Sequence, residues 1–184
     1  AITEGQIYNC YADKGYSYTK EKYVRCHPHE TPVNLIKGIE VSCNTYFCSI
    51  YYKYFSMFNY TSEAYNNWNK HLTSFGVGNY MNNDFISGSP GILPKSSYFE
   101  KLYKGSWNAN TIISMAIGQG ELLLTPIQMA NISAILANRG FYYTPHIVKK
   151  ISGQELIDTN FTKKKFCSIE PKYFESIIQG MRQV

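Results

Sequence analysis

The sequence predicts a mixed α+β domain. Apolar residues recur at a spacing of three and four over 33–54, and again near the C-terminus. This is the period of a helix that buries one face. Two other stretches, 6–23 and 141–151, are rich in aromatic or β-branched residues, which favour strands. Both kinds of element are therefore expected in one fold.

Length and composition agree with a globular domain. The 184 residues suffice for a single core, and 44% hydrophobic content excludes a disordered chain. No run approaches the roughly 18 apolar residues that span a bilayer. The start, Ala1–Gly5, lacks the features of a secretory signal and is typical of a helix end closed by glycine. We therefore expect the chain to be a piece of a longer protein.

The net charge of +5 is scattered, and Lys163–Lys165 is the only basic run. This distribution does not predict nucleic-acid binding. The 17 tyrosines occur together with many asparagines and lysines, which indicates the codon bias of an AT-rich genome more than a surface for base stacking.

The tyrosine-rich segment 6–23 is broken by Gly15 and predicts a hairpin of short strands. Within it, Ser17 and Lys20 have the spacing of a Ser-x-x-Lys nucleophile motif. That chemistry needs a helix on which the lysine ammonium reaches the serine oxygen. Because this stretch has no helical stripe, we interpret the match as coincidental.

A possible metal site comprises Cys10, Cys26, His29 and Cys43. Three cysteines and one histidine are a common ligand set for structural zinc. His27 could replace His29. Two alternatives stay open from the residues alone: a disulfide between Cys10 and Cys26 if the chain is exported, and free thiols buried as small apolar groups.

Ser42 and Asn44 interrupt an otherwise apolar helical pattern. Two polar side chains two residues apart can face one cleft, while the intervening Cys43 points away and could bind a metal behind it. Unpaired polar groups are costly in a core, which favours a cleft at this position. The alternative is that Ser42 or Asn44 caps the second helix.

The remaining elements follow in order. Thr61–Leu72 predicts a helix, Met81–Pro94 has loop composition and is expected only to connect, and Gly118 and Gly120 suit a tight turn. Thr125 and Pro126 predict a helix start, with the stripe ending at Gly140. Phe141–Ile151 is expected to be strand-like, and a last helix begins near 168–171 and continues to Val184.

Four motifs together resemble the transpeptidase domain of a class B penicillin-binding protein. They are Ser42–Phe47, Gly118–Gly120, the Thr125–Ala130 run and Gly180–Arg182. The cysteines and histidine make the chain similar to the cell-elongation type, some members of which carry zinc. The resemblance implies that 1–184 is a partial transpeptidase domain, truncated at both ends and mostly the helical part of the penicillin-binding protein and β-lactamase-like fold.

The resemblance also implies a function. The family cross-links peptidoglycan stem peptides by serine acyl transfer, and β-lactams trap the acyl-enzyme. Ser42 would relay protons, Asn44 would hold the substrate amide and the activating lysine, and zinc would be structural. The Ser-x-x-Lys and Lys-Thr-Gly motifs would lie before Ala1 and after Val184, so this chain alone is expected to be inactive.

The parent would be anchored by an N-terminal membrane helix, face the periplasm from the inner membrane, and act with other cell-wall synthesis proteins. Two alternatives remain open at this point. One is a non-catalytic β-lactam sensor or scaffold of the same fold. The other is a small zinc-stabilised binding module in which the Ser-x-Asn match is chance.

Overall fold

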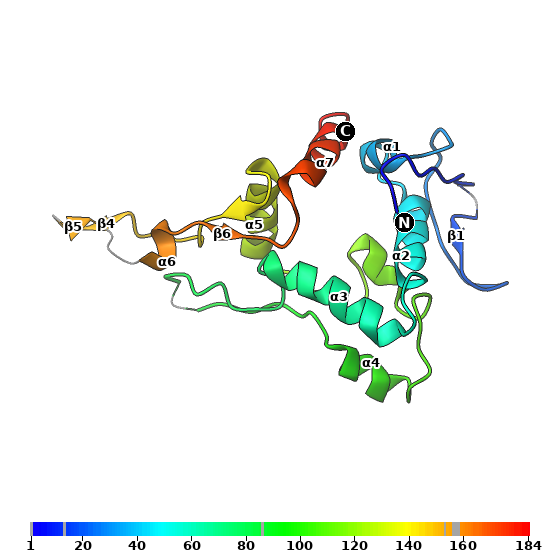
Figure 1. The fold of residues 1–184 in the computed structure, drawn as a ribbon, viewed down its shortest axis with the longest axis horizontal. Helices are drawn as coiled ribbons and strands as arrows, with labels where there is room; N and C mark the ends of the chain where they lie inside the picture. The colour runs from blue at the N-terminus through cyan, green and yellow to red at the C-terminus, as the bar shows by residue number, and fades with distance from the viewer. Residues whose placement is uncertain (1, 13, 86, 153, 156–158) are drawn as a thin grey trace. The chain divides into compact units, whose positions relative to one another are not determined.

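A computed structural model describes residues 2–12, 14–85, 87–152, 154–155 and 159–184. The chain divides into two compact units. Unit 1 consists of 1–68, 94–122 and 175–184, and unit 2 consists of 69–93 and 123–174. Figure 1 shows the course of the chain through both units.

Helices predominate over strands in the described residues. The α-helices are α1 (Leu35–Glu40), α2 (Asn44–Phe55), α3 (Thr61–Ser74), α4 (Ser96–Leu102), α5 (Pro126–Ala137), α6 (Thr159–Thr162) and α7 (Phe174–Met181), with 3₁₀ helices η1 (Ile113–Ile117) and η2 (Pro171–Tyr173). Three antiparallel two-stranded ladders pair β1 (Tyr16–Ser17) with β2 (Tyr23–Val24), β3 (Phe141–Tyr142) with β6 (Lys165–Phe166), and β4 (Lys150–Ile151) with β5 (Gln154–Glu155). The expected α+β class is confirmed, and so is the hairpin within 6–23.

The first described residues do not form the helix end that was expected before Gly5. Gln6 N–H donates to the Thr3 carbonyl in a turn, and Tyr8 and Val33 then exchange two backbone hydrogen bonds of 2.9 Å each. The backbone of this segment is thus paired with residues ahead of α1, which a local reading of the sequence cannot reveal.

The core of unit 1 forms where α2 packs against η1 (Figure 1). The aromatic rings of Tyr65, Phe99 and Trp107 meet here with centroids 5.2 to 5.7 Å apart. Such edge-to-face and tilted pairs add to the stabilisation from burial. The other fully or largely buried members are Cys48, Tyr51, Phe55, Ala64, Ala109, Ile112, Ile113 and Met115.

Tyr51 carries a buried polar group within this core. Its hydroxyl has no hydrogen-bond partner among the described residues, and burial strongly raises the pKa of the phenol. We expect Tyr51→Phe to raise the free energy of unfolding by about 1 kcal/mol, because the unpaired hydroxyl is removed from the core. Urea unfolding measures this. Tyr54→Phe is the contrasting variant, since the Tyr54 hydroxyl donates to Asn67 Oδ1 at 2.7 Å and its loss should not stabilise.

Helix α7 approaches α1 closely at Gly180. A Cβ there would lie 2.9 Å from Ile39 Cβ and 3.1 Å from the Ile36 carbonyl oxygen.

Helix α7 starts later and ends earlier than expected. The 3₁₀ helix η2 precedes it, and Gln183 N–H donates to the Gly180 carbonyl in a closing i to i+3 turn. Such tightening is common in the last turn of a helix.

In unit 2, α5 begins as expected. Thr125 is the N-cap, Pro126 is the first helical residue, and Thr125 and Gln128 form a capping box. Helix α3 likewise confirms the prediction for Thr61–Leu72. The described part of Met81–Pro94 contains no helix or ladder strand.

The strand expected over Phe141–Ile151 is largely wrong. Only its two ends are strands, β3 and β4. Between them, the backbone N–H groups of Ile147 and Val148 donate to the Asp84 carboxylate at 2.7 to 3.0 Å. Because these donors bind a side chain, they are not available to a β-ladder, and they lower the pKa of Asp84.

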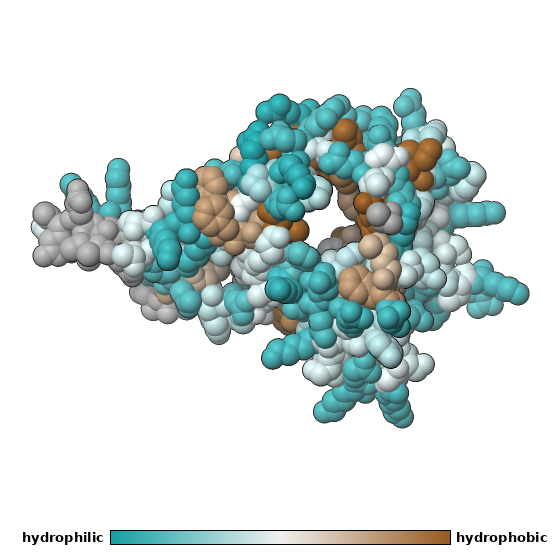
Figure 2. Space-filling model, in the orientation of Figure 1, coloured by the Kyte–Doolittle hydropathy of each residue, from teal (hydrophilic) through white to brown (hydrophobic). Residues whose placement is uncertain are grey.

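The face of the molecule in Figure 2 is mostly hydrophilic, with small hydrophobic patches. Within the described residues, no helix is both long and apolar enough to cross a bilayer.

Candidate functional site

An open pocket of about 350 Å³ in unit 1 contains both Ser42 and Asn44. Apolar side chains complete its lining: Ile39 and Phe47 from either side of the α1–α2 junction, and Ala116 and Ile117 from η1. The two polar residues that interrupt the helical pattern therefore face a common cleft. Cys43, which lies between them, does not line it and is fully buried.

The junction between α1 and α2 fixes this arrangement. Ser42 has φ = 48°, in the left-handed region that L-residues seldom adopt, so the position is strained. The N–H groups of Ser42 and Cys43 donate to the carbonyls of Ile39 and Gly38, which ends α1. The alternative that Ser42 or Asn44 caps the second helix is wrong: Cys43 is the N-cap, and its sulfur accepts from Tyr46 N–H at 3.4 Å.

The Asn44 side chain is held by a residue outside its own helix. Its Nδ2 donates to the Arg25 carbonyl at 2.9 Å. Arg25 directly precedes Cys26, so the position of the Asn44 amide is tied to the segment that carries Cys26 and His29. Nothing in the sequence pattern indicated this contact.

Behind the cleft, Cys10, Cys26, His29 and Cys43 come together. One ligand atom from each lies within 4.8 Å of every other. Cys26 Sγ is 4.0 Å from Cys43 Sγ and 3.5 Å from His29 Nε2. Tetrahedral zinc with bonds of about 2.3 Å to sulfur and about 2.0 Å to nitrogen requires separations of roughly 3.8 and 3.6 Å. The four residues thus fit a zinc ion with little movement.

His29, not His27, has its ring in this cluster. The Nδ1 atom of His29 is 2.8 Å from the Glu30 carbonyl oxygen, which can only accept, so Nδ1 carries a proton. Nε2 is then available as a metal ligand, in the arrangement usual for zinc-binding histidines. All five cysteines of the chain are free thiols, and the two outside the cluster, Cys48 and Cys167, are buried separately.

The electrostatics of the cluster favour one thiolate. Burial would raise the pKa of the Cys26 thiol, but hydrogen bonds outweigh it, chiefly from Thr45 N–H and His29, and lower that pKa to about 7. Burial raises the pKa of Cys10, and raises that of Cys43 to about 12. A metal would therefore have to displace protons from Cys10 and Cys43.

One further side chain and one backbone group support the cluster. Thr45 Oγ1 lies 3.0 Å from Cys10 Sγ and accepts from the thiol. The same helical turn provides the Tyr46 N–H that binds Cys43. A threonine in an apolar stripe was the only available signal for the first contact, and the second is a backbone group with no sequence signal.

The Ser17 and Lys20 match is not a nucleophile site. Ser17 lies in β1 and its Oγ donates to the Thr19 carbonyl at 2.8 Å, while Lys20 is in the exposed turn that follows. After η1, Gly118 and Gly120 both have positive φ (71° and 77°), as the expected tight turn requires.

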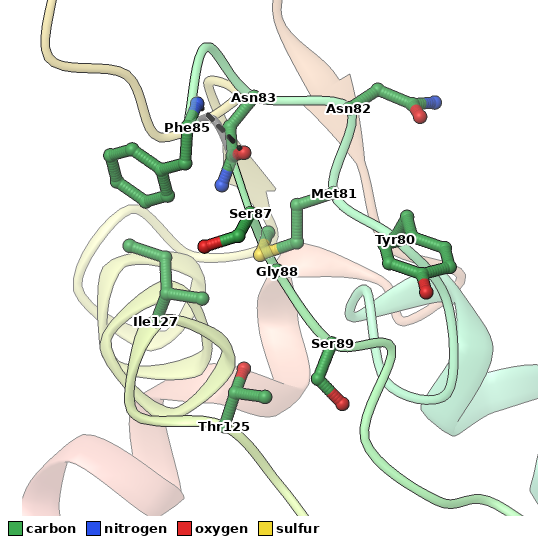
Figure 3. A pocket seen from close by; sticks show the side chains of 10 residues that line it. All are labelled: Tyr80, Met81, Asn82, Asn83, Phe85, Ser87, Gly88, Ser89, Thr125 and Ile127. Carbon is green, nitrogen blue, oxygen red and sulfur yellow. Dashed lines mark hydrogen bonds between the residues drawn. The ribbon is translucent and has the colours of Figure 1, made fainter.

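A second pocket, of about 440 Å³, lies in unit 2 at the start of α5 (Figure 3). Thr125 and Ile127 line it from α5 and its cap, and the other lining residues are 80–83, 85 and 87–89. No carboxylate, histidine, lysine or cysteine lines it among the residues that the structure describes. It therefore lacks the usual groups for acid–base or nucleophilic chemistry.

The cleft at Ser42 has a specific chemical capacity. Ser42 can donate and accept a hydrogen bond, and Asn44 Oδ1 can accept one. No lysine, histidine or carboxylate lines this pocket within the described ranges. The residues present can orient an amide and pass a proton, but they do not include a base to activate a nucleophile.

Comparison with known proteins gives the family. The penicillin-binding protein transpeptidase domain matches residues 1–184. The chain is 33% identical over 121 residues to the peptidoglycan D,D-transpeptidase MrdA of Acinetobacter baumannii, covering 66% of this chain and 17% of that protein. It is 33% identical over 123 residues to MrdA of Haemophilus influenzae, covering 67% of this chain and 18% of the relative. The chain therefore spans less than a fifth of the length of these relatives.

Solved structures agree on the fold. PBP2 of Pseudomonas aeruginosa, in a complex with WCK 5153, superposes with a TM-score of 0.75 at 23% identity, over 99% of this chain and 39% of that one. PBP2 of Helicobacter pylori, in a complex with MreC, gives a TM-score of 0.75 at 22% identity, over 99% and 31%. The chain belongs to the penicillin-binding protein transpeptidase domain family, class B and elongation type.

Proposed function

We propose that this chain forms one wall of the active site of a peptidoglycan D,D-transpeptidase, within a longer protein. The single observation that carries the proposal is the shared cleft of Ser42 and Asn44, set at a strained helix junction in a chain of the transpeptidase family. The name of the MrdA relatives specifies the same reaction.

In this proposal Asn44 binds the amide of a stem peptide. Its Nδ2 is engaged with the Arg25 carbonyl, and its Oδ1, which has no protein donor among the described residues, can accept from a substrate N–H. Ser42 passes a proton between the activating lysine of the nucleophile motif and the leaving amine, since a hydroxyl can accept and donate at once. The nucleophile and the Lys-Thr-Gly strand are contributed by residues outside this chain.

The cluster behind the cleft is proposed to hold a structural zinc ion through Cys10, Cys26, His29 and Cys43. When bound, zinc supplies cross-links between segments that are far apart in sequence. Cys43 then fixes the backbone between Ser42 and Asn44, and the segment of Cys26 fixes the carbonyl of Arg25 that holds Asn44. The proposed role is positional, since all four ligand places are taken by protein.

Location and partners follow from the same proposal. The parent acts on the periplasmic face of the inner membrane through an anchor outside this chain, and β-lactams acylate it. The Helicobacter pylori PBP2 was solved with MreC, which supports other cell-wall proteins as partners.

Penicillin labelling tests the function. We expect no covalent adduct when the 184-residue chain is incubated with benzylpenicillin and examined by intact mass spectrometry, because its cleft has no activated nucleophile. The longer protein should form one adduct per molecule, and Ser42→Ala should slow acylation by about 100-fold or more, an effect typical of lost proton transfer.

Two outcomes would contradict this proposal. A stoichiometric adduct on the 184-residue chain would return Ser17 to consideration as a nucleophile. No adduct on the longer protein would favour a non-catalytic scaffold of the same fold. A control variant, Ser49→Ala, removes a hydroxyl that donates to the Thr45 carbonyl on α2 and does not line the cleft, so acylation should be unchanged.

A further inference from the structure

A third pocket lies beside the Ser42 cleft in unit 1 and has a volume of about 450 Å³. Its lining combines two tyrosine rings, Tyr18 and Tyr103, with amide, hydroxyl and ammonium groups. The polar members are Thr19, Lys22, Asn108, Asn110, Thr111 and Ser114. None of these residues belongs to the metal cluster or to the cleft.

The hydrogen bonds of the asparagines that line this pocket use their side-chain oxygens. The N–H groups of Asn110 and Thr111 donate to Asn108 Oδ1 at 2.9 and 3.3 Å, which fixes the orientation of that amide. Asn110 Oδ1 accepts from the Tyr16 hydroxyl at 3.1 Å. Within the described residues, neither amide nitrogen donates to protein, and Lys22 is an exposed donor that cannot accept.

This combination suits a sugar that carries acetamido groups. The apolar C–H face of a pyranose ring can pack on a tyrosine ring, whose π face is electron-rich. Carbonyl and hydroxyl oxygens on the rim of the sugar accept from the amide nitrogens. A mostly apolar ligand would leave these donors unpaired, which is unfavourable.

The position relative to the cleft gives the pocket a role. Ile113 and Ser114 line this pocket, while Ala116 and Ile117 line the Ser42 cleft. In a 3₁₀ helix, residues three apart lie one above the other at a rise of about 6 Å, so the two sites occupy successive turns of η1. A ligand that joins a sugar chain to a peptide could occupy both.

We propose that the Tyr18–Tyr103 pocket binds the N-acetylated amino-sugar chain of the substrate while its stem peptide lies in the Ser42 cleft. This proposal rests on the proposed function, since it assigns the glycan part of the same substrate. It makes the pocket a second binding site that determines which glycan-linked peptides are presented to the cleft.

The test is a titration of chitotetraose, an oligomer of N-acetylglucosamine, into the ¹⁵N-labelled 184-residue chain. We expect millimolar binding with shifts of the Asn108 and Asn110 side-chain amide signals. The double variant Asn108→Asp and Asn110→Asp keeps the acceptor oxygens needed by the protein and removes both donors. Its affinity for chitotetraose should fall by at least about tenfold. Asn66→Asp, an exposed position on α3, is the matched control and should bind normally.

Three results would overturn the proposal. The first is that no amide signals shift at millimolar sugar in 10-fold molar excess, and the second is that the double variant still shows the shifts seen in the unaltered chain. The third is that inorganic phosphate produces the same shifts, which would indicate an anion site. The spectrum of the double variant outside the pocket shows whether it is folded. Penicillin labelling of the longer protein does not depend on this pocket. Labelling without sugar binding would therefore reject the glycan site alone, and sugar binding without labelling would reject the transpeptidase.

Discussion

Replacing Cys43 with alanine should abolish the stabilisation that zinc gives to this chain. Zinc at about 1,000 times its dissociation constant should raise the free energy of unfolding by about 4 kcal/mol, because it binds the folded state alone. Without the Cys43 sulfur, only Cys10, Cys26 and His29 remain as ligands. A metal held by these three would no longer be bonded to the α1–α2 junction. Thermal unfolding with zinc and with a chelator measures the difference.

Cys48→Ala is the matched control for this prediction. Both thiols are fully buried and both lie near the start of α2, but Cys48 packs in the core and not in the cluster. Its truncation should cost about 1–2 kcal/mol through lost packing while the shift caused by zinc persists. A zinc-dependent shift of equal size in Cys43→Ala would contradict the assignment of Cys43 as a ligand.

Replacing Gln128 with leucine should destabilise unit 2 by about 3–5 kcal/mol, because buried polar groups would lose their partners. The Gln128 side chain is completely buried. Its Nε2 donates to the carbonyls of Gly76, Pro90 and Asn79 at 2.9, 2.9 and 3.3 Å. Its Oε1 accepts from the N–H of Thr125 at 2.9 Å. One amide thus joins the end of α3, the loop before α4 and the start of α5.

Gln128→Glu separates the donor from the acceptor contribution. It has nearly the same shape and keeps an oxygen for Thr125, but it cannot donate to the three carbonyls, so it should also be strongly destabilised. Gln179→Leu on the exposed face of α7 is the control and should change stability by less than about 0.5 kcal/mol. A Gln128→Leu variant with an unchanged urea midpoint would show that the hydrogen bonds of the Gln128 amide contribute little to stability.

Local patterns predicted α2, α3 and α5 because the causes of these helices are local. Thr125 and Pro126 carry the cap and first turn of α5 within a few residues, and the apolar stripe of α2 is visible in one stretch. The same holds for the β1–β2 hairpin, whose turn lies at 18–22. These elements need no information from the rest of the fold.

The failures had distant causes. The strand expected over 141–151 is replaced by bonds to Asp84, about sixty residues earlier, and the start of the chain pairs with Val33. Cys43 caps α2, although cysteine is not a usual cap, because Asn44 is already helical. The first two outcomes depend on tertiary contacts that periodicity cannot specify, whereas the cap is a local contact with Tyr46 N–H that the residue type did not indicate.

The candidate site was predictable in part. Residue types at 10, 26, 29 and 43 suggested a ligand set, and the structure brings those four together. The choice between His27 and His29 needed the structure, which places the His29 ring 3.5 Å from Cys26 Sγ. The Arg25 contact that fixes Asn44, and the Thr45 contact with Cys10, follow only from the packing of separate segments.

The central claim is that a metal ion bound behind Ser42 and Asn44 holds the wall of the cleft. Elemental analysis of the purified chain, after removal of loosely bound ions, tests it most directly. We predict about one zinc per chain for the unaltered protein and for Cys48→Ala, and essentially none for Cys43→Ala. A chain that contains no zinc and takes none up when it is supplied, yet keeps its folded spectrum, would contradict the claim.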